Sequence, residues 1–282
     1  MNAVEVTNLR KSYDGLEAVR GISFDLRAGE VFGLLGPNGA GKTTTVEILE
    51  GYREPDAGEV TVLGADPRTA GAAWRQRIGV VPQTGELFPN LTVIEHLELF
   101  AGYYTEPRPP REVMALVGLE QKADARSRTL SGGQRRRLDL GIALVGDPEL
   151  LFLDEPTTGF DPGARRAAWE TIRSLRALGK TILLTTHYIE EAQRLADRVA
   201  VLRKGEIVAA GTPAELTAAA PASRISFRRD GEEVVIETED PVRALHDLTE
   251  KALRDGLRLD ALEVHRPTLE DVYLSLTEDE PE

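Results

Sequence analysis

The sequence predicts an α/β fold, in which a mostly parallel sheet is flanked by helices and followed by a small α+β domain. Two features of the 282 residues indicate it. Short apolar runs such as Val31–Leu35 and Leu150–Leu153 alternate with segments of helical spacing, and the composition and charge change near residue 220. With 41% hydrophobic and 29% charged residues, the chain can form one large domain and one small domain.

The part before residue 220 is expected to begin with sheet, continue through a helical insert at about residues 88–150, and end in alternating strands and helices. Strands are expected at Phe24–Leu26, Val31–Leu35, Thr61–Leu63, Leu150–Leu153, Thr181–Thr185 and Arg198–Leu202. Helices are expected at Leu91–Tyr104, Arg111–Val117, Arg135–Leu144, Arg165–Leu178 and Glu190–Ala196.

A turn and a run of small residues, Gly211–Ser223, separate the two domains, which are predicted to span residues 1–220 and 221–282. The second domain is expected to be a small α+β domain. Its predicted elements are a hairpin of Ile225–Arg229 and Glu233–Glu237 turning at Asp230 and Gly231, a helix at Val242–Leu253, a strand at Leu257–Val264 and a helix at Thr268–Leu276.

Charge and composition exclude several classes of protein. The net charge is −13, and residues 221–282 hold 17 acidic against 8 basic residues, or −9. An acidic surface disfavours a broad interface with DNA or RNA, so no nucleic-acid partner is expected. There is no cysteine, no apolar run approaches the roughly 18 residues of a membrane span, and Met1–Arg10 lacks a basic or apolar leader. We therefore expect a cytoplasmic protein.

A phosphate-binding loop follows the apolar run Val31–Leu35 and precedes an apolar helix. Glycines allow successive backbone N–H groups to surround phosphates, and the helix N-terminus adds a positive dipole. Lys42 is expected to reach the β- and γ-phosphates with an exposed side chain, and the Thr43 hydroxyl is expected to bind Mg²⁺. The predicted ATP-binding residues here are Gly36, Pro37, Asn38, Gly39, Ala40, Gly41, Lys42, Thr43 and Thr44.

A second apolar run, Leu150–Leu153, ends in the carboxylates of Asp154 and Glu155. The carboxyl ends of parallel strands share one edge of a sheet, so Asp154 is expected beside the phosphate loop as a ligand of Mg²⁺. Glu155 follows it directly and can hold or deprotonate the water that attacks the γ-phosphate. Together these two motifs predict a phosphate-loop NTPase.

Further motifs make the chain resemble the ATP-binding cassette (ABC) family over about residues 3–217. The family's signature sequence is present about twenty residues before Asp154, as Leu130, Ser131, Gly132, Gly133 and Gln134. Other matching positions are Tyr13, the aromatic residue that stacks on adenine, Gln83, Asp161 within Gly159–Pro162, and His187.

This resemblance implies a phosphate-loop cassette with a mostly parallel sheet, an antiparallel β subdomain and a helical signature subdomain. ATP and Mg²⁺ are the implied cofactors. The implied catalytic residues are Glu155, His187, Gln83 and Lys42, and the implied Mg²⁺ ligands are Thr43, Gln83 and Asp154. Ser131, Gly132, Gly133, Gln134 and Asp161 are implied to bind the nucleotide of a second subunit.

The signature needs that second subunit, because each chain's own ATP is already held by its phosphate loop. We therefore expect two ABC subunits placed head to tail, most simply as a homodimer, with ATP between Lys42 of one and Ser131 and Gly133 of the other. The resemblance also implies a separately encoded integral membrane permease. The chain is then expected on the cytoplasmic face of the membrane.

Within the family, three segments are similar to bacterial export ATPases of the multidrug and antibiotic-resistance type, including the daunorubicin-resistance type. They are Val31–Leu35, Arg135–Leu140 and Pro267–Tyr273. An exporter is the first hypothesis, and a soluble ABC ATPase of translation, DNA repair or chromosome maintenance is the alternative. The basic run Arg135–Arg137 is interpreted as a solvated helix face or a structural ion pair. The transported substrate is not encoded in the cassette motifs.

Overall fold

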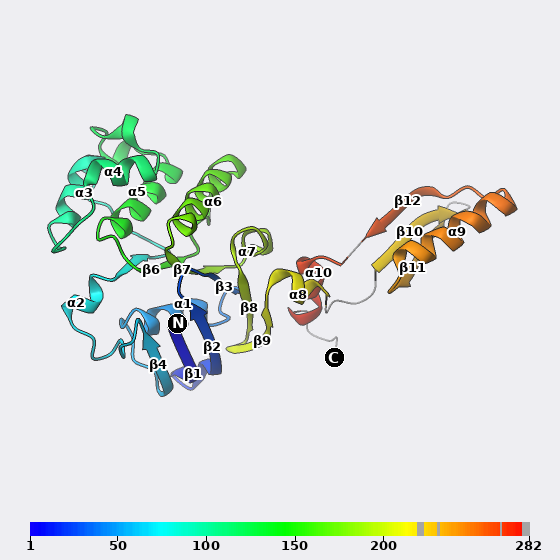
Figure 1. Cartoon of the computed structure of the whole chain (residues 1–282), viewed down its shortest axis with the longest axis horizontal. Coiled ribbons are helices and arrows are strands. Elements are labelled where there is room, and N and C mark those ends of the chain that lie inside the picture. The colour runs from blue at the N-terminus through cyan, green and yellow to red at the C-terminus, as the bar shows by residue number, and fades with distance from the viewer. Residues whose placement is uncertain (219–222, 230–231, 266, 278–282) are drawn as a thin grey trace. The chain divides into compact units, whose positions relative to one another are not determined.

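The structure, a computed structural model, describes residues 1–218, 223–229, 232–265 and 267–277 (Figure 1). It divides into two compact units, Met1–Thr212 and Pro213–Glu282. The second unit begins before the boundary predicted at residue 220, because helix α8 (Pro213–Ala218) packs against α10 (Leu269–Thr277). The predicted hairpin turn at Asp230 and Gly231 lies outside the described residues.

The first unit is built on a six-stranded sheet with the order β5-β6-β7-β3-β8-β9. All neighbours pair in parallel except β9, which is antiparallel to β8, and this confirms the predicted mostly parallel sheet. Because β7 lies between β3 and β6, the segments that follow these three strands meet at one edge of the sheet. The strands are β3 (Val31–Leu35), β5 (Ile78–Val81), β6 (Leu150–Asp154), β7 (Thr181–Thr186), β8 (Arg198–Arg203) and β9 (Glu206–Gly211).

Helices cover this sheet, and its residues alternate between two apolar cores. Along β6, Leu151 and Leu153 join the core formed with the helical part, whereas Leu150 and Phe152 join the core on the opposite face. A strand buried on both faces reads as a continuous apolar run, which is why β6 was recognisable in the sequence. The flanking helices are α1 (Lys42–Leu49), α2 (Ala72–Arg75), α6 (Pro162–Ala177) and α7 (Ile189–Leu195).

An antiparallel sheet of β2-β1-β4 forms the predicted β subdomain. Its strands are β1 (Asn2–Tyr13), β2 (Leu16–Arg27) and β4 (Ala57–Val62). Strand β1 was not expected, because register shifts after Val6 and a left-handed Asn8 (φ 49°) interrupt the two-residue alternation of buried side chains. The sequence therefore indicated only parts of this sheet.

The helical subdomain contains α3 (Val93–Ala101), α4 (Pro110–Leu116) and α5 (Gly132–Leu144), with short 3₁₀ helices at Glu120–Lys122 and Ser127–Thr129. These three α-helices pack on one another, and α5 also packs on β5. In Figure 1, α3, α4 and α5 form one group that is distinct from the β1-β2-β4 sheet. Helix α5 therefore joins the helical subdomain to the central sheet.

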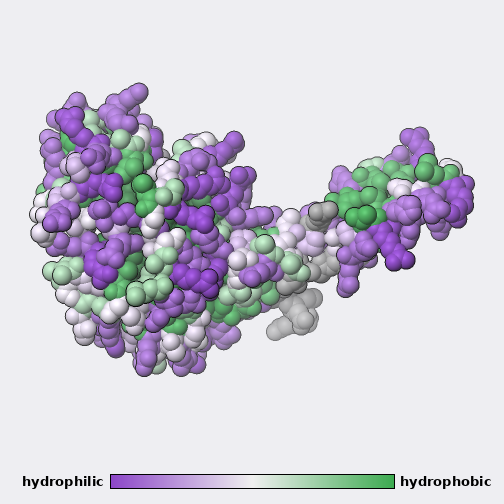
Figure 2. Space-filling view, in the orientation of Figure 1, coloured by the Kyte–Doolittle hydropathy of each residue, from purple (hydrophilic) through white to green (hydrophobic). Residues whose placement is uncertain are grey.

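The second unit contains a three-stranded antiparallel sheet of β11-β10-β12 with helix α9 packed on β10. Its core is small and includes Ile225, Phe227 and Ala252. In Figure 2, hydrophobic and hydrophilic residues are mixed on the visible face of this unit, and the visible face of the first unit is mostly hydrophilic. The elements are β10 (Ser223–Arg229), β11 (Glu232–Thr238), α9 (Pro241–Asp255) and β12 (Asp260–His265).

In the part of the chain that the structure describes, no helix is both long enough and apolar enough to span a membrane.

Candidate functional site

The predicted phosphate loop lies between β3 and α1 and is wrapped tightly against neighbouring backbone. A Cβ atom on Gly36 would lie 2.3 Å from the carbonyl oxygen of Leu202, and one on Gly41 (φ 102°) would lie 2.4 Å from that of Ala18. Only glycine fits these two places without moving the backbone. A Cβ on Gly39 (φ 78°) would meet nothing within 4 Å, so the loop opens on that side.

Helix α1 presents free amide groups beside this loop. Its first helical hydrogen bond runs from the Thr45 N–H to the Gly41 carbonyl oxygen, at 3.0 Å. The N–H groups of Lys42, Thr43 and Thr44 precede this first helical donor and therefore have no acceptor within the helix. Such amides, at the positive end of a helix dipole, form a binding site for phosphate oxygens.

The side chain of Lys42 is buried, contrary to the expectation that it is exposed; only 4% of it is accessible. Its ammonium group donates to the carbonyl oxygens of Gly36 (2.9 Å) and Pro37 (3.1 Å) and lies 3.3 Å from Oε1 of Glu155. A buried ammonium must find partners for its three N–H donors, and these three oxygens supply them. Two of these oxygens belong to the phosphate loop itself, and the third belongs to Glu155.

Asp154 lies at the end of β6 and is hydrogen-bonded to α1 and to β7. Its Oδ2 accepts a hydrogen bond from the Thr43 hydroxyl at 3.1 Å, and its Oδ1 accepts one from the Thr185 hydroxyl of β7. The residue is 5% exposed. The predicted meeting of Thr43 and Asp154 is thus present in the structure.

Glu155 is contacted by five residues and has a left-handed backbone conformation (φ 46°) that is uncommon for a non-glycine residue. Its N–H donates to the Thr185 hydroxyl at 3.0 Å. Its Oε2 accepts from Gln83 Nε2 (3.2 Å) and the Thr158 hydroxyl (3.0 Å), and lies 3.3 Å from His187 Nδ1. Lys42 approaches the other oxygen. The four residues predicted to be catalytic therefore meet at one carboxylate.

The pKa of Glu155 reflects two opposing effects. Burial raises it, but the charge of Lys42 and the contacts with His187 and Thr158 lower it, and the net pKa lies below the usual value. The carboxylate is therefore ionised at neutral pH. An ionised carboxylate can accept a proton from a water molecule placed next to it.

A cleft of about 530 Å³ opens beside Asp154, between α1 and the segment that follows β5. At its wall, burial and then the charges of Asp154 and Glu47 raise the pKa of Glu50 to about 8. Glu50 is thus mainly protonated at neutral pH. The polar residues of the cleft wall are Thr43, Glu47, Glu50, Tyr52, Gln83, Thr84 and Asp154.

The signature residues begin helix α5. The Ser131 hydroxyl accepts from the Gln134 N–H (3.3 Å), while the Gln134 side chain accepts from the Ser131 N–H (3.0 Å), which is a capping box. A Cβ on Gly132 would meet nothing within 4 Å, whereas one on Gly133 would lie 3.3 Å from the Cβ of Ala164 in α6. The signature helix therefore starts at an open surface next to the start of α6.

Two further predicted residues have local partners. Asp161 caps α6, since its Oδ1 accepts from the N–H groups of Gly163 (2.8 Å) and Ala164 (2.9 Å). Tyr13 ends β1, and the charged groups of Lys11 and Arg53 each lie 5.5 Å from the centre of its ring. The Tyr13 ring is thus in a cationic environment.

Sequence reasoning missed several residues of the site. The Thr185 hydroxyl of β7 donates to the Asp154 carboxylate and accepts from the Glu155 N–H, and the Thr158 hydroxyl donates to the Glu155 carboxylate. Buried Glu191 accepts from the Thr157 hydroxyl (2.8 Å) and the Trp169 ring N–H (3.0 Å), and burial raises its pKa. A search for hydroxyl residues at the ends of neighbouring strands could have found Thr185.

For Arg136, the solvated-face interpretation of the basic run Arg135–Arg137 is wrong, whereas the structural ion pair is present, with Asp139. The side chain of Arg136 is 12% exposed, and it donates hydrogen bonds to backbone carbonyl groups after β5 and β6. Its nearest approach to a carboxylate oxygen, that of Asp139, is 3.9 Å. A pattern of three consecutive arginines could not reveal this, because each points in a different direction around the helix.

Comparison with known proteins identifies the family. A sequence profile described as ABC transporter matches residues 19–158. The chain is 44% identical to the Nod factor export ATP-binding protein I of Ralstonia nicotianae, over 97% of this chain and 93% of the relative. The protein of the same name from Paraburkholderia xenovorans is also 44% identical, over 98% and 97%. The chain belongs to the ABC transporter family.

Solved structures of ABC cassettes agree with this assignment. The chain matches CbiO1 of Clostridium perfringens, part of the ABC transporter complex cbiONQ, with a TM-score of 0.70 and 29% identity over 77% of this chain and 91% of that one. An ATP-binding subunit of an ABC transporter matches with a TM-score of 0.68 and 30% identity, over 76% and 91%. A dimeric cassette bound to ADP and Pi matches with a TM-score of 0.67 and 26% identity, over 74% and 98%.

This ABC protein is therefore an ATP-binding and ATP-hydrolysing subunit of a transporter. ABC ATPase subunits of this kind dimerise and work with membrane permeases. The alternative of a soluble ATPase in translation, DNA repair or chromosome maintenance gains no support from these relatives.

Proposed function

We propose that this subunit hydrolyses Mg²⁺-bound ATP with Glu155 as the base and thereby powers export through a membrane permease. One observation carries the proposal: Lys42 at the start of α1, Gln83 after β5 and His187 after β7 converge on the Glu155 carboxylate. Buried titratable side chains that contact one another are typical of catalytic sites.

Lys42 and the amides of α1 bind the phosphates. In the structure the ammonium of Lys42 is shared between two loop carbonyls and Glu155. Phosphate oxygens are stronger acceptors than carbonyl oxygens, so Lys42 turns toward them when nucleotide binds. This exchange also removes one contact from Glu155 and leaves its Oε1 available for water.

The Thr43 hydroxyl and Asp154 would hold Mg²⁺, with Gln83, from the segment after β5, as a further ligand. Mg²⁺ prefers oxygen ligands and is commonly bound through one or two carboxylates, several waters and substrate phosphates. A hydroxyl 3.1 Å from a buried carboxylate fits that set of donors. When bound, the ion neutralises charge on the β- and γ-phosphates.

Glu155 accepts the proton of the attacking water, while Gln83, Thr158 and His187 fix the position of its Oε2. These three contacts leave the carboxylate little rotational freedom. Hydrolysis depends on an oriented water more than on covalent participation by the protein. Its lowered pKa keeps Glu155 in the basic form throughout the neutral pH range.

The second half of each ATP site comes from another subunit in a head-to-tail dimer. Ser131, Gly132, Gly133 and Gln134 form the start of α5, where Ser131 and Gly132 are exposed, and such a helix N-terminus can receive phosphate oxygens. Asp161 lies at the start of α6, next to this surface. A homodimer is the simplest arrangement, because one chain carries both halves. Tyr13 stacks on the adenine of its own subunit.

Export is the proposed direction, supported by relatives named Nod factor export ATP-binding protein I at 42% to 44% identity. The multidrug and antibiotic-resistance type remains a prediction from the sequence. The permease holds the protein at the cytoplasmic face of the membrane. In native cells, the tagged chain should sediment with membranes, and recovery of all of it in the supernatant would contradict this placement.

Two threonines of α1 provide a test of the Mg²⁺ site. Thr43→Val removes the hydroxyl that contacts Asp154, and Thr45→Val is the matched control, because the Thr45 hydroxyl donates to the Gly41 carbonyl oxygen instead. We expect Thr43→Val to need at least about tenfold more Mg²⁺ for half-maximal ATP hydrolysis. Thr45→Val should keep the wild-type Mg²⁺ dependence.

Equal Mg²⁺ dependence of Thr43→Val and the wild type would remove Thr43 from the metal site. Failure of the wild-type chain to hydrolyse ATP, with Mg²⁺ and with or without its permease, would contradict the proposed function as a whole.

A further inference from the structure

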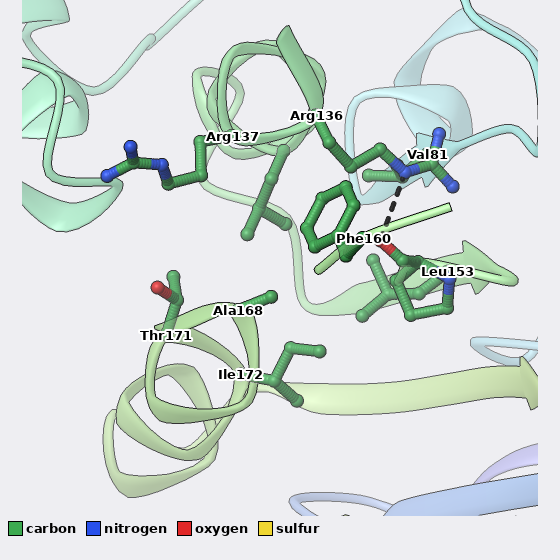
Figure 3. A pocket seen from close by; sticks show the side chains of 10 residues that line it. Val81, Arg136, Arg137, Leu153, Phe160, Ala168, Thr171 and Ile172 are labelled. Atoms are coloured by element: carbon green, nitrogen blue, oxygen red, sulfur yellow. Dashed lines mark hydrogen bonds between the residues drawn. The ribbon is translucent and has the colours of Figure 1, made fainter. Parts of the chain in front are cut away.

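Arg136 of the signature helix α5 binds the backbone on both sides of the catalytic carboxylate. Its side chain is 12% exposed and borders a small apolar cavity that also contains Phe160 and Leu153 (Figure 3). The acceptors of its guanidinium are the carbonyl oxygens of Asp154 (2.7 Å), Glu155 (3.4 Å), Pro156 (3.3 Å), Pro82 and Gln83 (3.5 Å).

The partners of Arg136 are unusual for a buried cation. Within the described residues, Asp139 is the one carboxylate within 4 Å, at 3.9 Å, so the charge is stabilised mainly by carbonyl dipoles. A guanidinium offers five N–H donors in a planar fork, which lets it reach two backbone segments at once. Burial lowers the pKa of Arg136, but an arginine stays charged at any physiological pH.

The two segments that Arg136 joins hold the reacting side chains. One segment follows β5 and carries Gln83, and the other ends β6 and carries Asp154 and Glu155. The Gln83 amide and the Glu155 carboxylate meet at 3.2 Å. By binding the carbonyl groups of both residues, Arg136 fixes the backbone from which this contact is made.

The start of helix α5 carries the signature residues, which are proposed to bind the ATP of the partner subunit. Ser131 caps the helix five residues before Arg136, which is about 7.5 Å along the helix axis. A hydrogen-bonded helix moves as a rigid element over such a distance. Any shift of Ser131 therefore displaces the guanidinium against the carbonyl groups of Gln83 and Glu155.

We infer that Arg136 is a positioning residue that couples the signature half-site, at the start of α5, to Glu155 and Gln83 of the same subunit. Since the proposed dimer places the partner's ATP on that half-site, Arg136 links occupancy of one ATP site to hydrolysis at the other. This inference rests on the proposed function. It explains why the signature helix carries a buried arginine whose hydrogen bonds all go to backbone carbonyl groups.

The next residue, Arg137, provides a matched control. It is in the same helix and borders the same cavity, but its guanidinium donates to the Gly118 carbonyl oxygen at 3.0 Å, inside the helical subdomain. Arg137→Met therefore makes the same change of side chain and charge as Arg136→Met, but it removes no hydrogen bond to the segments of Gln83 or Glu155. Arg136→Met fits beside the apolar cavity but donates no hydrogen bond.

The test uses the purified full-length chain with Mg²⁺ and ATP. For Arg136→Met we expect kcat to fall by about 100-fold, as misplacement of a catalytic group by about 1 Å causes. We expect a Hill coefficient for ATP above 1 in the wild type, because its two sites are coupled, and a value of about 1 in Arg136→Met. Binding of trinitrophenyl-ATP and the thermal midpoint relative to Arg137→Met should not change. Arg136→Lys, with three donors on one atom, should give intermediate values.

Three results would overturn the inference: a wild-type kcat and Hill coefficient in Arg136→Met, a lower kcat with an unchanged Hill coefficient, or equal losses in Arg136→Met and Arg137→Met. If Arg136→Met does not fold, Arg136→Lys decides, and wild-type kinetics of that variant would contradict the coupling. These outcomes are distinct from failure of the proposed function, which would appear as a wild-type chain that does not hydrolyse ATP.

Discussion

The two units of the molecule differ in how their charged groups are paired. In the first unit, buried charges meet across long stretches of sequence, as Lys42 does with Glu155. In the described residues of the second unit, charged groups also make local contacts at the surface, such as Arg254 with Glu250 and Asp271 with Thr268. Hydrogen bonds from Thr268 and then His265 lower the pKa of Asp271 to about 2, but the contacts cap a helix.

This difference indicates that the charged groups of the first unit take part in catalysis, whereas those of the second unit stabilise its fold. Burying a charge costs free energy, so a fold retains a cluster of buried charges where they bind or react with something. Surface pairs and helix caps contribute about 1 kcal/mol each and need no ligand to explain them. We therefore expect changes in the first unit to affect ATP hydrolysis strongly, and loss of the second unit to leave it largely intact.

The largest expected effect is that of Lys42→Ala. The variant loses the ammonium that binds the phosphates, and kcat should fall by roughly 100- to 1000-fold, with weaker ATP binding. Because Glu155 then keeps its charge without a cationic partner, the thermal midpoint of the apo protein should fall as well. Steady-state hydrolysis and differential scanning calorimetry measure the two effects. Lys180→Ala is the control, because Lys180 pairs with Asp147 instead of a site residue. An equal loss of kcat in both variants would contradict the special role of the buried Lys42.

Glu50→Gln should change the pH dependence of stability by a few kcal/mol. The folded-state pKa of Glu50 is about 8, and the unfolded value is 4.5. Between these values the native state holds a proton that the unfolded state has released, so wild-type stability falls as pH rises through this window. Glutamine does not titrate, so the stability of Glu50→Gln does not fall in this way as pH rises. Denaturant titrations of the apo protein in EDTA should show its advantage growing from pH 5 to pH 9, and parallel curves would contradict the pKa.

The smallest expected effect is that of removing the second unit. A chain that ends at Thr212 keeps all six strands of the central sheet and every predicted catalytic residue. It should bind trinitrophenyl-ATP as the full chain does, because a domain with its own core folds independently. Loss of binding by a folded truncated chain would show that the second unit takes part in nucleotide binding. Its role would otherwise be sought in regulation or permease coupling.

The same contrast explains what could be predicted from the sequence. The phosphate loop, the carboxylates after β6 and the signature were recognisable because each is a short linear pattern with its own physical logic. Thr185 and Arg136 were not recognisable, because their contacts depend on which strands pair and on which direction α5 faces. The burial of Lys42 was missed for the same reason: Glu155 comes more than 100 residues later.

Secondary structure followed a similar rule. Buried parallel strands such as β3 and β7, each with a short run of apolar residues, were predicted nearly to the residue. In the second unit, α9 was found from its regular spacing of apolar residues. Strand β1 was missed, since a bulge removes the alternation on which strand prediction depends.

The central claim is that Glu155 is the base of an ATPase that closes as a dimer, and Glu155→Gln tests it most directly. Glutamine keeps the size and the hydrogen-bonding capacity of the side chain but cannot accept the proton. Lys42, Thr43 and Asp154 remain in place to bind Mg²⁺ and ATP. Ser131→Arg in the same chain is the control, because it blocks the second half-site without altering the first.

The measurement is light scattering coupled to gel filtration, with saturating Mg²⁺ and ATP, together with the rate of phosphate release. We predict that Glu155→Gln binds ATP, releases no phosphate and accumulates as a dimer, because ligand that binds only the closed state shifts the equilibrium toward it. The double variant with Ser131→Arg should stay monomeric. Phosphate release by Glu155→Gln at the wild-type rate, or a dimer that persists in the double variant, would contradict the account.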